Sequence, residues 1–319
     1  MKTLIADKFE SEGIQQLEAA GCVIAQDVDL QDESLALALS SNGVELLIVR
    51  STVVTGDMIK GASSLKLIIR AGSGYNNIDT AAAKSCGVAV ANCPGMNAIA
   101  VAELAMGLIL ALDRRIVDNV VDIRKGVWNK KEYSKAPGLF GRTLGVVGMG
   151  KIGHLLAERA HAFGMKIVYS DVVPNTKAET ELGAKRVDFD DVLKQGDYVS
   201  LHVPLLDSTR GMMNADRFKM MKPTAKLINC SRGEVVSSED LVKAIENGDI
   251  AGAGLDVYEN EPGPSDKSFA DAVAKCDRIY GTHHIGASTD QAQMAVADEV
   301  VRIVKQYKAN GEVLHCVNP

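Results

Sequence analysis

The feature that most constrains the fold is the glycine pattern of Gly148-Met149-Gly150-Lys151-Ile152-Gly153. It directly follows the apolar segment 144–147 and opens a segment with helical spacing. A strand, a glycine-rich turn and a helix in this order are typical of dinucleotide-binding α/β domains. The first glycine allows a tight turn, the second lets the backbone approach a pyrophosphate, and the third lets the helix pack on the strand. Free N–H groups and the positive dipole at the helix start then favour phosphates.

One acidic residue indicates which dinucleotide is bound. Asp171 follows the next strand-like segment, about 20 residues after the glycines, where a carboxylate accepts hydrogen bonds from ribose hydroxyls. It would repel a 2′-phosphate, and neither Arg nor Lys follows it immediately. The sequence therefore predicts NAD rather than NADP. The alternative is a glycine turn without a ligand beside a surface aspartate.

Short apolar runs alternate with helix-like segments along the chain, which predicts parallel sheets covered on both faces. We predict an α/β fold of two doubly wound parallel-sheet domains. A Rossmann-type NAD-binding domain (99–287) is inserted into a flavodoxin-like substrate domain (1–98 and 288–319). Helices at 97–115 and 290–309 are expected at the two crossings, the second with no strand after it. The strand-like runs are 4–6, 45–49, 65–69 and 88–91 in the first series, and 144–147, 166–169, 198–201, 226–229 and 253–256 in the second.

Charge and composition exclude several classes of protein. The net charge is −6 with acids and bases interspersed, which argues against nucleic acid as a partner. The six cysteines form no CxxC pair, so neither a disulfide framework nor a metal site is expected. The most apolar stretch, 104–112, is about half the length needed to span a bilayer. The N-terminal apolar run is cut by Asp7 and does not resemble a signal peptide, so we expect a cytoplasmic protein without membrane association.

Five ordered motifs carry a resemblance that covers essentially the whole chain. They are Arg70–Asp79, the glycine pattern, Asn229–Gly233, Gly254–Pro262 and His284–Thr289. Together they resemble the D-isomer-specific 2-hydroxyacid dehydrogenase family, and within it the phosphoglycerate dehydrogenase branch most. Many members of that branch carry a further C-terminal domain for serine feedback. This chain ends at Pro319 without one, so we expect no serine inhibition of that kind.

The resemblance implies a catalytic trio of Arg232, Glu261 and His284. Reduction of a 2-oxo acid needs a proton donor at the carbonyl oxygen, and imidazole titrates near neutral pH. Glu261 would pair with His284 and favour its imidazolium form. Arg232 would bind the substrate's carboxylate and carbonyl with its planar donors. The family usually has proline before the catalytic histidine, whereas this chain has His283, which removes a φ constraint and places two imidazoles side by side.

Further cofactor contacts follow from the same resemblance. The backbone N–H groups of Lys151 and Ile152 would meet the pyrophosphate. The loop with Gly72, Ser73 and Gly74 would meet the substrate carboxylate and the nicotinamide, since repeated glycines let backbone N–H groups approach an anion. An ordinary strand-to-helix turn is the alternative for this loop. The residues expected to border the adenosine and nicotinamide riboside are Val203, Cys230, Ser231, Arg232 and Asp256.

A phosphorylated substrate needs positive charge beyond the catalytic arginine. Arg50 and Arg70 each end a predicted strand, and adjacent parallel strands would bring them to one edge. Asn97 would bind the phosphate or instead cap the following helix. Lys130 would add a phosphate contact, although neighbouring lysines make a solvated basic surface an equal alternative.

These residues predict oxidation of 3-phospho-D-glycerate to 3-phosphooxypyruvate, the first step towards serine. A glyoxylate or hydroxypyruvate reductase with the same trio is the first alternative. An NAD-sensing corepressor without catalysis is an alternative from another class. By family resemblance, the segments from Asn97 to Trp128 are expected to form a homodimer interface.

Overall fold

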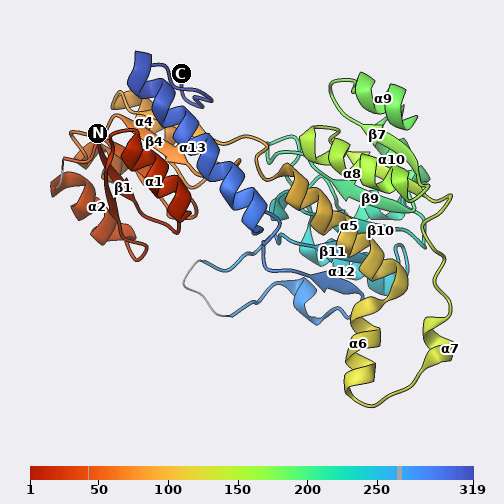
Figure 1. The fold of residues 1–319 in the computed structure, drawn as a ribbon. Helices are drawn as coiled ribbons and strands as arrows, with labels where there is room; N and C mark the ends of the chain where they lie inside the picture. Colours follow the sequence, from red (N-terminus) through yellow and green to blue (C-terminus); the bar gives the residue numbers. More distant parts are fainter. Residues whose placement is uncertain (42, 264–267) are drawn as a thin grey trace. The chain divides into compact units, whose positions relative to one another are not determined.

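The computed structural model describes residues 1–41, 43–263 and 268–319, which form two compact units. Unit 1 comprises Met1–Asn97 with Ser288–Pro319, and unit 2 comprises Ala98–Ala287. Each unit contains one sheet of parallel strands between two layers of helices (Figure 1). The predicted fold class, two doubly wound α/β domains, is confirmed.

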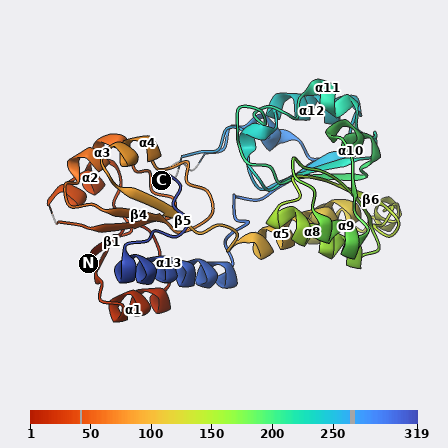
Figure 2. The same ribbon diagram turned by 90° about the horizontal axis from the view of Figure 1, so that it is seen from above.

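The sheet of unit 1 has the strand order β2-β1-β3-β4-β5, which is that of flavodoxin-like folds. Figure 2 shows α2, α3 and α4 on one face of this sheet and α1 and α13 on the other. The strands are β1 (Lys2–Ile5), β2 (Val23–Gln26), β3 (Leu46–Val49), β4 (Leu67–Arg70) and β5 (Ala89–Asn92). The helices are α1 (Ser11–Ala19), α2 (Asp32–Ser41), α3 (Gly56–Gly61), α4 (Thr80–Ser85) and α13 (Asp290–Asn310).

Continuous apolar strands follow from this layering, because successive side chains point to opposite faces. In β3, Leu46 and Ile48 pack in the core beneath α1 and α13. Leu47 and Val49 pack in the core beneath α2, α3 and α4. All four residues of β3 are therefore buried.

The tail after α13 pairs with the edge strand β5. Val317 N–H donates to the Val90 carbonyl at 2.8 Å, and Ala91 and Cys316 form an antiparallel bridge. The side chain of Asn318 accepts a hydrogen bond from Val90 N–H at 2.8 Å. Among the described residues no strand follows α13, as the sequence predicts, but these isolated contacts still bind the tail to β5.

The sheet of unit 2 has the order β12-β11-β10-β9-β6-β7-β8, which places the first strand of the unit, β6, beside its second and fourth strands as in Rossmann folds. In Figure 2, α5, α8 and α9 cover one face and α10, α11 and α12 the other. The strands are β6 (Thr143–Val147), β7 (Lys166–Ser170), β8 (Lys185–Arg186), β9 (Tyr198–Leu201), β10 (Lys226–Asn229), β11 (Gly252–Leu255) and β12 (Ile279–Gly281). The helices are α5 (Ala98–Arg114), α6 (Ile116–Arg124), α7 (Lys130–Tyr133), α8 (Lys151–Ala162), α9 (Thr176–Leu182), α10 (Phe189–Gln195), α11 (Ala215–Lys219) and α12 (Ser238–Asn247), with short 3-10 turns η1 (Gly233–Val235) and η2 (Ala272–Lys275).

The apolar helix α5 is explained by its packing within unit 2. It contacts α8, β10 and β11, and its Ala102, Ala105 and Ile109 are completely or almost completely buried. Gly254 on β11 leaves room for it, since a Cβ there would lie 3.0 Å from the Leu108 side chain. In the part of the chain that is described, no helix has both the length and the apolarity needed to cross a membrane.

Candidate active site

The glycine turn between β6 and α8 has the geometry of a phosphate cradle. Gly148 has φ +93°, and a Cβ there would lie 2.8 Å from the His202 carbonyl group. A Cβ on Gly153 would overlap the Gly148 carbonyl oxygen. Gly150, in contrast, faces open space, with no atom within 4 Å of the position of a Cβ. Two glycines are thus required by packing, and the third leaves room for a ligand.

The N-terminus of α8 directly follows the glycine turn. Gly150 is its N-cap and supplies no side-chain hydrogen bond, and Lys151 and Ile152 are the first helical residues. The first N–H groups of a helix have no partner within the helix, and the dipole favours negative charge there. The cradle and these donors fit the pyrophosphate of a dinucleotide.

Asp171 lies directly after β7 and is held against the glycine turn. Its carboxylate accepts hydrogen bonds from Met149 N–H at 2.6 Å and Val173 N–H at 3.1 Å. Arg186, which the sequence analysis missed, donates through Nη2 to the Asp171 carbonyl at 2.8 Å and to the Val172 carbonyl at 3.2 Å. The Arg186 guanidinium beside Asp171 is therefore bound to main-chain oxygens. Arg186 lies on β8, which is only two residues long and has no sequence pattern that would predict it.

The catalytic candidates follow three neighbouring strands. Arg232 comes after β10, Glu261 after β11, and His284 after β12, and these strands pair in parallel in that order. Their carboxyl ends therefore meet at one edge of the sheet, where α/β enzymes bind ligands. The Nδ1 of His284 lies 2.8 Å from Oε2 of Glu261, and the side chain of His284 is 54% exposed.

The pairing sets the chemistry of the imidazole. A carboxylate can only accept, so Nδ1 of His284 is the donor and Nε2 is left to exchange a proton. The hydrogen bond to Glu261 raises the pKa of His284 above its ordinary value, although burial acts in the opposite direction. His202, which directly follows β9 at the carboxyl edge of the sheet, differs because burial lowers its pKa to about 4. His202 is therefore neutral near pH 7 and unsuited to donate a proton.

The turn that carries His284 is held by Asp256. His284 has φ +52°, which is uncommon for a residue with a side chain. Asp256 is 2% exposed, and its carboxylate accepts hydrogen bonds from Thr282 Oγ1 at 2.6 Å, Ile285 N–H at 2.9 Å and Gly286 N–H at 2.8 Å. The His284 N–H donates to the Asp256 carbonyl at 2.8 Å. These bonds stabilise the unusual backbone, so the carboxylate predicted to border the cofactor also anchors this turn.

The turn that carries Arg232 has its own anchor in Asn229. The Asn229 amide donates to the Arg232 carbonyl at 2.9 Å and accepts from Ser231 N–H and Oγ at 3.0 and 2.7 Å. Cys230, between them, is buried. Gly233 directly follows Arg232, and a Cβ at Gly233 would overlap the main chain of Tyr258. The turn that carries Arg232 therefore packs directly against the loop that leads to Glu261. Val203 lies beside the glycine turn, with its N 3.1 Å from where a Gly148 Cβ would be.

In unit 1, Arg50 and Arg70 lie at the same edge of the sheet. Arg70 ends β4 opposite Val49, and Arg50 directly follows Val49. The Arg50 guanidinium donates to Gln293 Oε1 on α13 at 3.1 Å, and no local sequence pattern marks Gln293 as its partner. The guanidinium of Arg70 lies over Gly72, where a Cβ would overlap Nη1.

Ser73 and Asn97 are joined to one another. The Ser73 hydroxyl accepts from Gly95 N–H at 3.1 Å and lies 2.9 Å from Asn97 Oδ1 and 3.2 Å from the Cys93 carbonyl. No hydrogen bond from Asn97 to the first turn of α5 occurs among the described residues, so the capping alternative lacks support. The hydroxyl of Ser73 therefore clamps the loop that contains Gly74 to the segment before α5.

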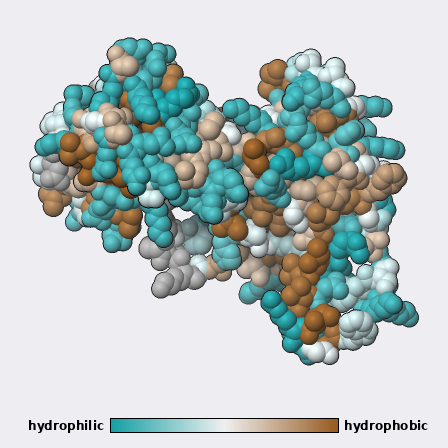
Figure 3. Space-filling model, viewed as in Figure 1, coloured by the Kyte–Doolittle hydropathy of each residue, from teal (hydrophilic) through white to brown (hydrophobic). Residues whose placement is uncertain are grey.

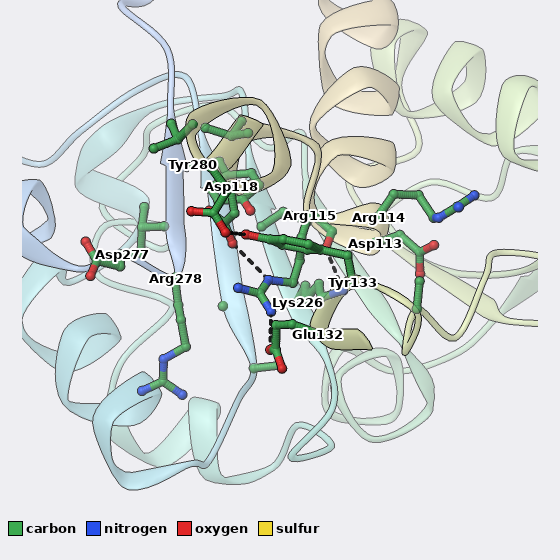
Figure 4. Close-up of a pocket in the computed structure, with 18 of the residues that line it drawn as sticks. Asp113, Arg114, Arg115, Asp118, Glu132, Tyr133, Lys226, Asp277, Arg278 and Tyr280 are labelled. Atoms are coloured by element: carbon green, nitrogen blue, oxygen red, sulfur yellow. Dashed lines mark hydrogen bonds and ion pairs between the residues drawn. The ribbon is translucent and has the colours of Figure 1, made fainter. Parts of the chain in front are cut away.

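Lys130 lies away from the catalytic trio, on α7. It lines a small cavity of about 260 Å³ with Trp128 and neighbouring residues of α6 and α7. A larger cavity, of about 1040 Å³, lies between α6, α7 and the amino ends of β10 to β12 (Figure 4). Its charged lining is largely paired internally, as in the bonds of Arg115 to Asp118 and Glu132. No predicted catalytic residue lines it, so we place the chemistry at the opposite, carboxyl edge.

The chain is similar to several known proteins. The family described as D-isomer specific 2-hydroxyacid dehydrogenase, NAD binding domain, matches residues 106–286. Hydroxypyruvate reductase of Thermotoga maritima is 44% identical over 259 residues, covering 81% of this chain and 83% of the relative. D-3-phosphoglycerate dehydrogenase of Methanocaldococcus jannaschii is 38% identical over 309 residues, covering 96% of this chain and 57% of the relative. The structure of D-lactate dehydrogenase from Aquifex aeolicus with NAD and lactic acid matches with a TM-score of 0.85 and 28% identity, covering 100% of this chain and 99% of that one.

Proposed function

Because this chain belongs to the D-isomer-specific 2-hydroxyacid dehydrogenase family, we propose that it oxidises 3-phospho-D-glycerate to 3-phosphooxypyruvate. It is an NAD-dependent oxidoreductase. The observation that supports the phosphorylated substrate is the position of Arg50 and Arg70 at one edge of the sheet of unit 1. Two guanidinium groups there supply the donors and the charge that a phosphate requires.

We infer the following roles for the chain's own residues. Arg232 binds the substrate's carboxylate and polarises its carbonyl group. Hydride transfer to or from the carbon that carries the hydroxyl or oxo group would be supplied by NAD when it is bound. His284 takes the hydroxyl proton at Nε2 in the oxidative direction and returns it to the carbonyl oxygen in the reductive direction. Glu261 orients the ring through Nδ1 and stabilises the imidazolium form.

A hydroxypyruvate or glyoxylate reductase is a second candidate with support of its own. The hydroxypyruvate reductase of Thermotoga maritima is the more identical relative of the two described above, and this chain covers more of its length. Such an enzyme would use the same trio without the phosphate contacts. The extra guanidinium groups of Arg50 and Arg70 would then serve only the fold, as the bond from Arg50 to Gln293 does.

A substrate panel decides between these two. Steady-state rates are measured at 340 nm with NADH and phosphohydroxypyruvate, hydroxypyruvate, glyoxylate or pyruvate. We expect kcat/KM to be highest for phosphohydroxypyruvate, by roughly 100-fold, because two charged hydrogen bonds contribute about 3 kcal/mol or more. Equal efficiency with hydroxypyruvate would favour the second candidate. Tight NAD binding without turnover of any acid would instead favour the corepressor alternative.

We also propose that α6 forms a homodimer interface. Its surface is apolar, as the brown column in Figure 3 shows, and its exposed residues include Ile116, Val117, Val120, Val121 and Ile123. Trp128 beyond it is 80% exposed. Apolar surface of this kind is typical of protein interfaces. Light scattering of the wild type and of Val120→Asp would test the proposal. We expect the wild type to be a dimer and the substitution to dissociate it.

The cytoplasmic location stays a prediction from the sequence.

A further inference from the structure

A buried carboxylate outside the predicted motifs holds the loop that carries Glu261. Asp271 lies directly before η2 and is only 4% exposed. Aspartate is rarely buried to this extent unless its oxygens are hydrogen-bonded. Here the donors come from three separate segments of unit 2: the start of α12, the loop after β11, and η2 itself. The Asp271 carboxylate therefore links these three segments through hydrogen bonds.

Two of the hydrogen bonds to Asp271 come from the residue immediately before Glu261. Asn260 donates to Asp271 Oδ2 through its backbone N–H at 3.0 Å and through its side-chain amide at 3.3 Å. Ser238 Oγ donates to the same oxygen at 3.0 Å. Ser238 N–H also donates to Glu259 Oε2 at 2.8 Å. Segment 259–260 is thus bound to α12 through the Glu259 side chain and to Asp271 through Asn260.

The same loop reaches the segment that leads to His284. Tyr258 OH donates to the Thr282 carbonyl at 2.7 Å, and the Tyr258 ring packs edge-on against Phe269 with centroids 4.7 Å apart. Tyr258 N–H donates to Glu261 Oε1 at 3.1 Å. One oxygen of Glu261 is therefore held by its own loop, and the other is directed at His284.

We propose that Asp271 is a positioning residue for the reaction: by binding Asn260 it fixes the loop that directs Glu261 at His284. This inference rests on the proposed function, in which the Glu261–His284 pair moves the proton. Asp271 has no hydrogen bond to either member of the pair among the described residues. The charges of Glu261, Asp256 and Arg232 are the main ones that shift the pKa of His284, and that of Asp271 is not among them, so Asp271 acts through geometry rather than through its own charge.

A titration of His284 by NMR tests this without any turnover. The chain has six histidines, so imidazoles labelled with ¹³C give few signals, and His284 is assigned by its absence from the spectrum of His284→Asn. Asp271→Ala removes the two hydrogen bonds that Asn260 donates to the carboxylate, which lets Glu261 move away from the ring. We expect the pKa of His284 to fall by roughly one unit, the scale on which loss of a close opposite charge shifts a pKa.

Two comparisons separate geometry from charge and from general loosening of the fold. Asp271→Asn keeps an acceptor for Asn260 and Ser238 but removes the charge, so the pKa of His284 should stay near that of the wild type. In the Glu261→Gln background, Asp271→Ala should cause no further fall, because the pairing is already lost. The matched control is Asp197→Ala, which removes an anchor at the opposite edge of the same sheet, bound to Thr143 N–H and Lys222 Nζ at 2.8 Å each. Asp197→Ala should lower the free energy of unfolding and leave the pKa of His284 unchanged.

The outcomes discriminate between the two proposals. If Glu261→Gln lowers the pKa of His284 and Asp271→Ala does not, the positioning role is overturned and the proposed function stands. Equal falls in Asp271→Ala and Asp271→Asn would also overturn it, since charge alone would then act. An unchanged pKa in Glu261→Gln would reject the pair in the proposed function. If Asp271→Ala does not fold, Ser238→Ala removes one bond to the same oxygen, and a smaller fall is expected; no fall would overturn the inference.

Discussion

Nδ1 of His284 lies 2.8 Å from Oε2 of Glu261, although the two residues follow different strands and are 23 positions apart. The distance is that of a charge-assisted hydrogen bond. It fixes which ring nitrogen donates to the carboxylate, and it raises the pKa of the imidazole. The pair therefore determines both the direction in which a proton leaves the ring and the pH range in which the ring carries one.

The first prediction concerns the pH dependence of reduction. The reductive direction needs His284 protonated, so kcat/KM should be constant at low pH and fall as pH rises through the raised pKa. Glu261→Gln removes the charge that raises this pKa, so the falling limb should move to lower pH. Rates at 340 nm from about pH 5 to about pH 10, a range that includes the ordinary histidine pKa of about 6.5 and values well above it, would check this. A limb at the same pH in both proteins would contradict the assigned pairing.

The second prediction concerns His284→Asn. Asparagine tolerates positive φ better than most residues, so the turn held by Asp256 should keep its conformation at φ +52°. We expect kcat to fall by about 10²- to 10⁴-fold, the usual contribution of a positioned acid or base. The Kd for NADH, measured by fluorescence titration, should change by less than about twofold, because the side chain acts on the substrate. A parallel loss of NADH affinity would indicate a cofactor role instead.

Much of the fold could be predicted because its strands have strong local patterns. The buried runs of β3 and β4 are apolar at every or nearly every position, and the glycine turn has a spacing that few other structures require. Strands β2 and β8, which the sequence analysis did not predict, lack such patterns. In β2, Val23 is exposed at the edge of the sheet, and β8 consists of two charged residues paired only through the main chain.

The anchors of the site could not be predicted for a different reason. The bond between Ser238 and Asp271 spans 33 positions, and that between Arg50 and Gln293 spans 243. Each partner is a polar residue that resembles an ordinary surface or cap residue in the sequence. Their role depends on which loops the sheet brings together, so only the folded structure reveals it.

The third prediction concerns Arg70 and the glycine beneath it. Arg70→Ala should lower kcat/KM for phosphohydroxypyruvate by roughly 10- to 100-fold, the loss of one or two charged hydrogen bonds, and change that for hydroxypyruvate little. Gly72→Ala should have a similar selective effect, because its Cβ would displace the guanidinium and its φ of +149° disfavours a side chain. Ser51→Ala, at an exposed hydroxyl near Arg50, is a control that should leave the ratio of the two substrates unchanged. Equal losses with both substrates would place Arg70 outside phosphate binding.

The fourth prediction concerns Asp171→Ala. The carboxylate is the group expected to bind the ribose hydroxyls, and it also accepts from Met149 N–H within the glycine turn. We expect the Kd for NADH to rise by about tenfold and that for NADPH to rise less or to fall, because repulsion of the 2′-phosphate is removed. Fluorescence titrations with both dinucleotides would measure this. Asp171→Asn, which keeps one acceptor, should have a smaller effect on NADH, and an unchanged preference in both variants would rule out Asp171 as the selective group.

The fifth prediction separates cofactor binding from folding within the glycine turn. A Cβ on Gly150 meets no protein atom within 4 Å and its φ of −72° suits alanine, so Gly150→Ala should change the free energy of unfolding by less than about 1 kcal/mol. The same Cβ stands where the pyrophosphate would approach, so the Kd for NADH should rise at least about tenfold. Gly153→Ala should instead lower the free energy of unfolding by about 1–3 kcal/mol, since its Cβ overlaps the Gly148 carbonyl and forces the helix from the strand. Urea unfolding without cofactor and NADH titration would measure the two effects. Loss of stability in Gly150→Ala with unchanged NADH affinity would mean that the open space at this glycine is not the phosphate site.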